Sequence, residues 1–315
     1  MPVTLGTAHG RTDHPRGWTG VVPWGEARWP GTEPRRAMNT DDAWGAPALD
    51  LPRYLRRVGL AAPPAPDLAG LTDLVRAHAR TLPWENFDAV RGVPGELTLD
   101  ALQRRMIDGR RGYGCTGHVP LLAAVLQRTG FRFGAASGRV LVDGRPSAST
   151  HALLVVEVDG APHLAEVGFG AVPTVPLRLE SGLEQDADGW RYRLTASTVG
   201  FGEEWQLDFL DPSSGQWRPQ YRFSLTDRTW SDLRMTNFYV ATSPHSPFRG
   251  RPMAVVNRPG LRHVLTRDAV ITTRPDGGRE SVPYVAADRR AILAETFAID
   301  LPADEDAALT ALSAS

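Results

Sequence analysis

Three kinds of residue in this sequence could together perform acyl transfer: a cysteine, a histidine and a carboxylate. Cys115 is the only cysteine among 315 residues, and it lies in the segment RRGYGCTGHVPLL, between an arginine- and glycine-rich turn and an apolar run. A cysteine becomes a strong nucleophile when it loses its proton beside an imidazolium, and a third group then orients that imidazole. A lone cysteine can also be a small buried hydrophobic residue without reactivity. The residues that the fold brings to it decide between the two.

A hairpin can be predicted downstream of the cysteine. In the segment HALLVVEVDGAPHLAEVGFG, Asp159-Gly160 separates two apolar, β-branched runs, which is a strong signal for a two-residue turn between antiparallel strands. Val158 then lies opposite Ala161, and this pairing sets the register of the whole hairpin.

That register brings His151 and Glu166 to one face of the hairpin. It places Leu153 opposite Glu166 and His151 opposite Gly168, and side chains alternate between the two faces of a strand. His151 and Glu166 are therefore expected to be diagonal neighbours, ~7–8 Å apart at the backbone and within reach of long side chains. Both faces of the hairpin are largely apolar, so Glu166 should be buried and should need a partner. At this point, a purely structural role for a His–Glu pair inside a core remains an alternative.

The surroundings of Cys115 favour the reactive alternative. The preceding turn is flexible and cationic, and a helix follows, so the positive end of the helix dipole could stabilise a thiolate. Pro120 lacks an N–H, which predicts that the regular helix begins near Val119, one turn after the cysteine. His118 is an alternative base. We rank it below His151 because no carboxylate is positioned by local geometry to orient it.

The composition excludes several kinds of chemistry. All 35 basic residues are arginine and none is lysine, which removes Schiff-base catalysis, lysine-bound pyridoxal phosphate and a P-loop lysine. One cysteine cannot form an internal disulfide or a thiolate zinc cluster, so a reducing, cytoplasmic location and no metal site are expected. The formal net charge of −1 predicts no nucleic-acid or membrane partner, and no apolar run approaches the ~20 residues of a membrane helix.

Helical periodicity begins after a segment without pattern. Residues 1–47 are rich in Gly, Pro and Trp, which predicts a disordered N-terminal tail. Apolar spacing then predicts four helices, the first ended by Gly59 and the second capped by Asp67. The predicted helices cover 51–59, 67–82, 98–109 and about 119–129. They form one helical domain, 48–130, which carries the cysteine.

From Phe131 onward the apolar period changes to two, which is typical of strands. The sequence therefore predicts a β-rich domain, 131–230, that carries His151 and Glu166. A mixed α/β domain, 231–315, follows it, with a last helix around DRRAILAETFAI. The strand-like segments are FRFGAASGRVLV, HALLVVEV, HLAEV, WRYRLTA, WQLDFL, AVVN, RHVLT and AVITT. The fold class is α+β.

These motifs, in this order and spacing, resemble those of the arylamine N-acetyltransferases. The family's R-G-G-Y-C motif reads RGYGC at Arg111–Cys115, its histidine segment reads STHALLVVEV, and its D-V-G-F-G segment reads EVGFG at Glu166–Gly170. Similar segments flank them: LPWENFDAV upstream, and TNFYVATSPHSPF and ETFAIDLP downstream. The resemblance spans about Leu51 to Pro302.

The resemblance implies a helical N-terminal bundle, a central β-barrel and a C-terminal α/β lid around a papain-like cysteine-enzyme core. Cys115 would take an acyl group from acetyl-CoA or another acyl thioester, His151 would activate it, and Glu166 would orient the histidine. The acyl group would then pass to an arylamine, arylhydroxylamine or hydrazine in a ping-pong cycle, with no tightly bound cofactor. Arg110 and Glu85 match positions that the family pairs by charge, so a structural ion pair is expected there.

Four further residues receive roles from the same resemblance. Trp84 and Phe169 would line the substrate cleft. Gly168 and Gly170 would let the backbone approach the pyrophosphate of CoA. A small aromatic amine and a CoA thioester are thus the implied partners.

Several residues depart from the family pattern. Glu166 stands where Asp is usual, and Trp84 where Phe is usual. The Gly-Tyr order before the cysteine is inverted in Tyr113-Gly114, and the run Thr116–Val119 replaces a Phe-Glu-x-Asn-like run. The changes beside the cysteine would suit a larger substrate.

Other functions follow from the same departures. One is an amide synthase that releases or cyclises a polyketide bound to an acyl carrier protein. Another is a catalytically inactive family member that serves as a binding protein. A cysteine peptidase is a more distant alternative.

Overall fold

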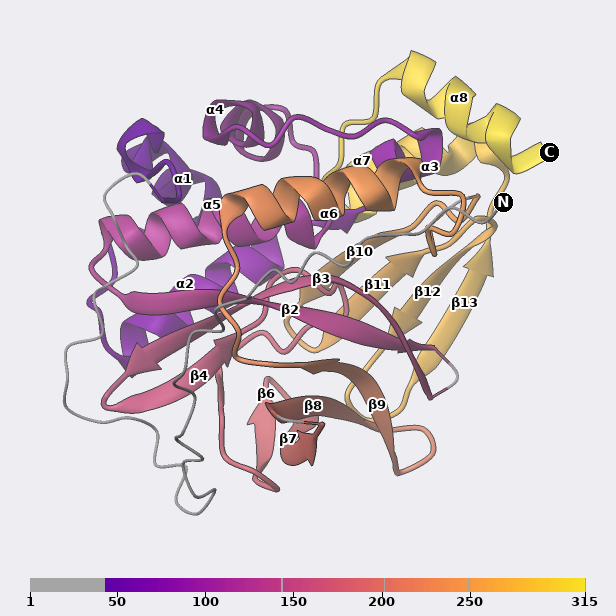
Figure 1. Cartoon of the computed structure of the whole chain (residues 1–315). Coiled ribbons are helices and arrows are strands. Elements are labelled where there is room, and N and C mark those ends of the chain that lie inside the picture. Colours follow the sequence, from indigo (N-terminus) through magenta and orange to yellow (C-terminus); the bar gives the residue numbers. More distant parts are fainter. Residues whose placement is uncertain (1–42, 143, 201, 249, 315) are drawn as a thin grey trace, which may run out of the picture. The chain divides into compact units, whose positions relative to one another are not determined.

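The computed structural model describes residues 43–142, 144–200, 202–248 and 250–314 (Figure 1). Most of the predicted tail, 1–47, lies outside them. Its last residues pack onto the fold: Trp44 is buried, and its ring stacks on that of Trp230 with centroids 6.2 Å apart. Described residues before position 48, the predicted start of the helical domain, are thus already packed on the fold.

Within the described residues, five α-helices precede the first long strand. Helix α2 begins after Asp67, whose Oδ1 accepts a hydrogen bond from the Gly70 N–H at 2.8 Å, and α1 ends at Gly59 in a left-handed conformation, as predicted. Helix α4 continues into a π-helical stretch, η2, and a short 3₁₀ turn, η1, precedes α1. The bounds are η1 (Ala46–Ala48), α1 (Leu51–Val58), α2 (Leu68–Thr81), α3 (Phe87–Arg91), α4 (Leu99–Leu102), η2 (Gln103–Asp108) and α5 (Cys115–Arg128).

Helix α5 carries Cys115 at its first position, earlier than predicted. Pro120 predicted a start near Val119, but α5 begins at Cys115 with Gly114 as its N-cap. The Gly114 carbonyl accepts a hydrogen bond from the His118 N–H at 3.2 Å, so helical bonding is established before the proline. The proline removes only the one bond that its own N–H would have donated to the carbonyl four residues earlier.

Eight antiparallel strands form the central sheet, in the order β5-β4-β3-β2-β9-β8-β7-β6. The side chain of Gln185 in β6 bonds to the backbone N–H and carbonyl of Arg178 in β5, at 2.8 and 3.0 Å, so the sheet is a nearly closed barrel. The strands are β2 (Arg132–Val142), β3 (Arg145–Val158), β4 (Ala161–Ala165), β5 (Leu177–Arg178), β6 (Glu184–Ala187), β7 (Trp190–Val199), β8 (Gly202–Asp211) and β9 (Gln216–Phe223).

The hairpin of β3 and β4 has the predicted register. Val158 pairs with Ala161, and the ladder continues to Leu154 opposite Ala165. The turn residues Asp159-Gly160 have φ values of 51° and 73°, the left-handed conformations that a tight hairpin turn requires. The predicted hairpin is therefore confirmed.

A second antiparallel sheet has the order β1-β10-β11-β12-β13. Its first strand comes from the helical region, with Trp84 paired to Val255, so the sheet joins segments far apart in the sequence. Figure 1 shows β10 to β13 side by side, and Val256, Leu293 and Phe297 share one core cluster between this sheet and α7. The elements are β1 (Trp84–Glu85), α6 (Trp230–Thr242), β10 (Ala254–Arg258), β11 (Leu261–Leu265), β12 (Ala269–Thr273), β13 (Arg279–Pro283), η3 (Ala286–Asp288), α7 (Arg289–Thr296) and α8 (Ala303–Ala314).

The predicted domain boundaries fall between elements of this fold. The boundary at 130 lies between α5 and β2, and the boundary at 230 lies at the start of α6. As divisions into separate domains they stay predictions. Helices α3, α6 and α8, and strands β1, β5, β6, β9 and β13, were not predicted from the sequence pattern.

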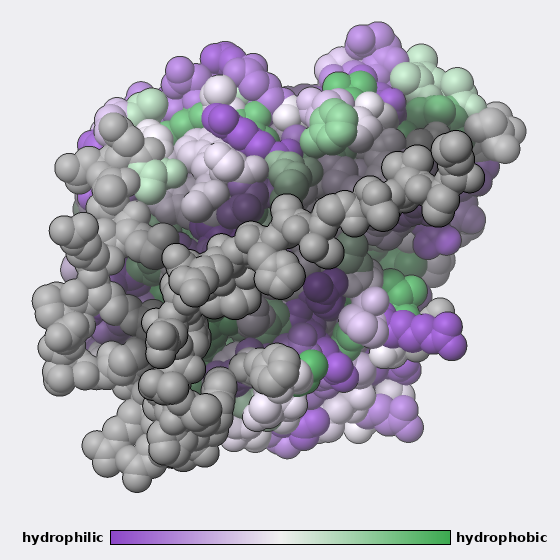
Figure 2. All heavy atoms as spheres, in the orientation of Figure 1, coloured by the Kyte–Doolittle hydropathy of each residue, from purple (hydrophilic) through white to green (hydrophobic). Residues whose placement is uncertain are grey.

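The surface mixes polar and apolar residues. On the face drawn in Figure 2, hydrophilic and hydrophobic residues are interspersed. Large apolar side chains are exposed on α6 at Met235, Phe238 and Tyr239, which share one face of that helix. No helix in the described part of the chain combines the length and the apolar character needed to cross a bilayer.

Gly117 tests the close packing that holds the start of α5. A Cβ at this position would lie 2.3 Å from Cγ of the buried Tyr113 ring. We expect Gly117→Ala to lower the free energy of unfolding by about 1–3 kcal/mol through overpacking, measured by urea denaturation. Gly202→Ala is the control, since its Cβ would meet open space, and it should change that free energy by less than about 0.5 kcal/mol. Equal losses in the two variants would contradict the close packing.

Candidate active site

Cys115 lies at the first position of α5 and lines a cavity of about 400 Å³. The residue is half-buried, and its Sγ lies 3.6 Å from the carbonyl oxygen of Thr150. The first N–H groups of a helix have no partner within the helix, and the positive end of the dipole lies there, so this position favours an anionic sulfur. The cysteine is therefore reachable from a cavity and is not an enclosed core residue.

His151 and Glu166 are in direct contact, as the hairpin register predicted. Nε2 of His151 and Oε2 of Glu166 are 2.8 Å apart. Strand β4 ends at Ala165, so the ladder pairs predicted beyond it do not form, yet the two side chains still meet. Cys115 is also close enough to His151 to help raise the pKa of its imidazole. Because Nε2 is engaged by Glu166, Nδ1 is the ring nitrogen left for the sulfur.

Glu166 is fully buried, and three donors satisfy its carboxylate. Besides His151, the Tyr221 hydroxyl donates to Oε2 at 2.6 Å, and the Gly168 N–H donates to Oε1 at 2.7 Å. Burial raises the pKa of Glu166, but the charge of His151 and these hydrogen bonds outweigh it and hold the pKa below its ordinary value. The carboxylate is therefore ionised at neutral pH.

The imidazole of His151 is held in its charged form. Burial lowers the pKa of His151, but the Glu166 charge and the hydrogen bond with Cys115 outweigh it and raise the pKa to about 10. The rings of Phe169 and Tyr221 flank it, with centroids 5.2 and 4.6 Å away. A protonated ring in this place can stabilise a thiolate and can later give its proton to a leaving group.

Gly168 and Gly170 each have a structural reason to be glycine. A Cβ on Gly168 would lie 2.6 Å from the Cβ of Cys115, so only glycine lets this loop touch the cysteine. Gly170 has a φ of 86°, which glycine adopts without strain. Of the two, Gly168 lines the cavity. Their role in approaching the pyrophosphate of CoA stays a prediction.

Trp84 and Phe169 both line the cavity beside Cys115 and His151. The Trp84 ring packs against that of Phe248, with centroids 5.7 Å apart. The rest of the wall is largely apolar and includes Val93, Val140, Val142, Val240 and Met253. Such a wall suits a small aromatic molecule.

His118, the alternative base, is held by a chain of hydrogen bonds directed away from the sulfur. Its Nε2 lies 3.2 Å from the Pro83 carbonyl oxygen, and its Nδ1 lies 2.9 Å from Nε2 of His78. Nδ1 of His78 lies 2.9 Å from the Tyr54 hydroxyl. A carbonyl can only accept, so Nε2 of His118 carries the proton and its Nδ1 accepts from His78. Burial lowers the pKa of His118 to about 4, and both ring nitrogens are engaged, so it cannot serve as the base.

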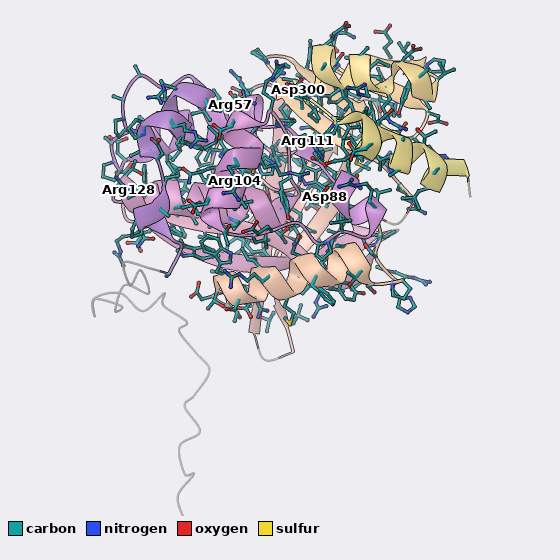
Figure 3. The ribbon with its side chains drawn as sticks, turned by 90° about the horizontal axis from the view of Figure 1, so that it is seen from above. Arg57, Asp88, Arg104, Arg111, Arg128 and Asp300 are labelled. Atoms are coloured by element: carbon teal, nitrogen blue, oxygen red, sulfur yellow. The ribbon has the colours of Figure 1, made fainter. Side chains whose placement is uncertain are left out.

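Glu85 pairs with Arg111 and Arg105, and the expected pair with Arg110 is wrong. Oε1 of Glu85 lies 2.7 Å from Nη2 of Arg105 and 3.0 Å from Nη2 of Arg111. Arg110 has a φ of 46° and lies 3.7 Å from the Asp300 carboxylate. The left-handed backbone turns the chain at this point, so two consecutive arginines reach different partners. Figure 3 labels Arg111 and also Asp300, the residue near the C-terminus that pairs with Arg110.

The same ion cluster continues to α3 and α8. Arg105 donates to Asp88 at 2.7 Å and, through Nε, to the Gly112 carbonyl at 2.8 Å. Arg111 donates to Glu305 of α8 at 2.8 Å. Removing one partner from such a buried cluster leaves an uncompensated charge, which is strongly destabilising. The turn before Cys115 is thereby tied to α3 and to the C-terminal helix α8.

Two features of the site were not predicted. Tyr221 lies 55 residues from Glu166 in the sequence, in a strand that contains Pro219, and no local pattern connects the two residues. The Thr116 hydroxyl donates to Oδ1 of Asn237 in α6 at 3.0 Å, and both side chains line the cavity. Only the three-dimensional pairing of distant elements reveals these contacts.

Known proteins are similar to this chain in sequence and in fold. A family model described as N-acetyltransferase matches residues 67–306. The arylamine N-acetyltransferase of Mycolicibacterium smegmatis is 37% identical over 264 residues, which cover 81% of this chain and 93% of the relative. The solved arylamine N-acetyltransferase from Mycobacterium abscessus superposes with a TM-score of 0.82 at 33% identity, over 87% of this chain and 98% of that chain. The Mycobacterium marinum enzyme, solved in complex with CoA, gives a TM-score of 0.75 at 34% identity, over 84% and 98% of the two chains.

The family model matches the chain from α2 into α8. The matched range contains Cys115, His151 and Glu166, and the solved relatives have the same mixed fold with its nearly closed barrel. This chain belongs to the arylamine N-acetyltransferase family.

Proposed function

We propose that this protein transfers an acetyl group from acetyl-CoA to an arylamine through an acetyl thioester on Cys115. The observation that carries the proposal is the chain of contacts from Cys115 through His151 to the buried Glu166, beside an apolar cavity. The Mycobacterium marinum relative solved with CoA supports the choice of donor. An amide synthase, an inactive binding protein and an acyl carrier protein as partner find no support among the relatives.

In the first half-reaction, the imidazolium of His151 stabilises Cys115 as a thiolate. The sulfur attacks the carbonyl carbon of acetyl-CoA, a new carbon–sulfur bond forms, and the bond to the CoA sulfur breaks. Nδ1 of His151 gives its proton to the leaving CoA thiolate. Glu166 accepts the hydrogen bond from Nε2 throughout and so keeps the ring in one orientation.

The start of α5 has a second role in this step. The thioester oxygen becomes negatively charged when the sulfur attacks, and it then lies near the first turn of the helix that carries Cys115. The unpaired N–H groups of that turn can stabilise the charge without reorganisation.

In the second half-reaction, an arylamine enters the cavity and attacks the acetyl carbon on Cys115. Nδ1 of His151, now neutral, takes the proton from the amine, and the thiolate leaves. We assign contact with the aromatic ring to Trp84 and Phe169, and close backbone approach of the CoA pyrophosphate to Gly168 and Gly170. Arylhydroxylamines and hydrazines present the same nucleophilic nitrogen and belong to the same acceptor class.

Acetylation of the enzyme itself tests the proposal. Incubation with acetyl-CoA alone should add one acetyl group to Cys115, because no acceptor is present to remove it; mass spectrometry of the peptide measures this. Adding aniline should remove the group and release acetanilide, and Cys115→Ser should do neither. Wild type that stays unmodified would contradict the proposal, and loading by carrier-bound thioesters alone would revive the amide-synthase alternative.

Glu166 can be tested by two substitutions of graded severity. Glu166→Gln should lower kcat/KM for acetyl transfer by about 10²–10⁴-fold, because a neutral amide no longer stabilises the imidazolium. Glu166→Asp keeps the charge and should retain activity to within about tenfold of wild type. Tyr221→Phe is the matched control, since it removes one donor to Glu166 but leaves the carboxylate. A Gln variant as active as wild type would refute the orienting role.

The raised pKa of His151 predicts how Cys115 reacts across pH. Since the ring stays protonated up to about pH 10, wild-type Cys115 should react rapidly with iodoacetamide at neutral pH. His151→Ala should react slowly at neutral pH and faster only toward pH ~8.5, where an ordinary thiol ionises. Superimposable alkylation profiles for the two proteins would exclude the charged pair.

The raised pKa of His151 also affects the stability of the fold. Because the pKa is about 10 in the folded protein and 6.5 in the unfolded chain, its stabilising contribution is fully present below pH 6.5 and is lost as pH rises through 10.

A further inference from the structure

Arg262 in β11 is a buried cation without a carboxylate partner among the described residues. Its exposed fraction is 6%. A buried arginine ordinarily pairs with an anion, as Arg289 does here: it is 2% exposed and lies 2.7 Å from the Asp306 carboxylate. Arg262 must therefore be stabilised by neutral groups alone, and those groups indicate what it does.

The neutral partners of Arg262 surround the guanidinium. Nε donates to Oδ1 of Asn257 at 3.1 Å, and Nη2 donates to the Tyr192 hydroxyl at 2.9 Å. The guanidinium carbon lies 4.4 Å from the centroid of the Trp190 ring and 5.7 Å from that of Phe209. Two π faces and two polar partners fix the position of the charge at the junction of the barrel and the second sheet.

The remaining hydrogen bonds of this pair end on the loop that follows Glu166. Nη2 of Arg262 donates to the Val172 carbonyl at 3.2 Å. Nδ2 of Asn257 donates to the Gly170 carbonyl at 2.9 Å. Because Arg262 binds Oδ1 of Asn257, the amide must point its Nδ2 at the loop. The two side chains thus hold the same loop at two carbonyls.

This loop, Gly168–Val172, contacts every part of the catalytic arrangement proposed above. Gly168 packs on Cys115, and its N–H holds Oε1 of Glu166. Phe169 packs on His151, and the loop also forms part of the cavity wall. A shift of the loop would therefore change the distance and orientation of several reacting groups together.

We propose that Arg262, with Asn257, is a positioning residue for acyl transfer: it holds the Gly168–Val172 loop against the nucleophile and the His151–Glu166 pair. The inference rests on the proposed function for the identity of the reaction. The loop contacts, and their effect on the reactivity of Cys115, do not depend on the proposed function. A role in fold stability alone would leave that reactivity unchanged in the molecules that remain folded.

The test compares two buried arginines of different surroundings. Arg262→Met keeps the length and apolar contacts of the side chain but removes its donors. Arg289→Met does the same at a buried arginine whose hydrogen bonds go to Asp306 and Thr310 of α8. Urea denaturation measures the stability of each variant, and iodoacetamide labelling of Cys115 across pH measures the reactivity of the folded protein. We expect both variants to lose stability. Arg262→Met alone should lower the labelling rate at neutral pH, by about tenfold, and move the labelling profile to higher pH.

Two further variants test the proposal even if Arg262→Met does not fold. Arg262→Lys should restore part of the labelling rate, because an ammonium can still donate to a loop carbonyl. Asn257→Leu leaves Arg262 in place and releases only the Gly170 carbonyl, so it decides the matter if Arg262→Met does not fold. Labelling profiles identical to wild type in folded Arg262→Met or Asn257→Leu would overturn the proposal.

The same experiment separates this inference from the proposed function. Iodoacetamide labelling needs neither acetyl-CoA nor an amine. A protein that is labelled as expected but never acetylated would refute the proposed substrates and leave the positioning role standing. A protein that is acetylated normally, with labelling unaffected by Arg262→Met, would refute the positioning role alone.

Discussion

The contact between His151 and Glu166 constrains the rest of the site. Glu166 has no exposed surface, so an ionised carboxylate can persist there only if donors replace the lost water. The imidazolium, the Tyr221 hydroxyl and the Gly168 N–H supply them. The hairpin register, the barrel strand that carries Tyr221 and the glycine loop are each needed to complete this set. The barrel thus brings together the groups that stabilise this buried charge pair.

Cys115, the proposed nucleophile, is positioned by a different set of interactions. Cys115 begins a helix whose later residues lie in the core, and Gly117 lets the Tyr113 ring pack directly against its first turn. The preceding turn is held by Arg105 and Arg111 through the buried Glu85. Helix packing and the ion cluster bring Cys115 to the barrel edge, where Gly168 touches it. The helical region and the barrel, which share one hydrophobic core, thus meet at the proposed nucleophile.

Local sequence patterns were enough to predict part of the fold and of the candidate site. The Asp159-Gly160 turn and the alternation of side chains predicted the His151–Glu166 contact, because register and face are set within one hairpin. The predicted start of α5 near Val119 was wrong, because a proline near the start of a helix removes only one hydrogen bond. Tyr221, and the partners of Arg110 and Arg111, could not be predicted. They depend on elements that are far apart in sequence and on one left-handed residue that redirects the chain.

The central claim is that His151 and Glu166 form a charged pair beside Cys115 in the resting protein. Nitrogen NMR of the labelled imidazole at neutral pH tests it most directly, because protonated and bare ring nitrogens resonate at different frequencies. The raised pKa of His151, about 10, predicts that both ring nitrogens carry protons. A neutral ring with one bare nitrogen at neutral pH would contradict the account.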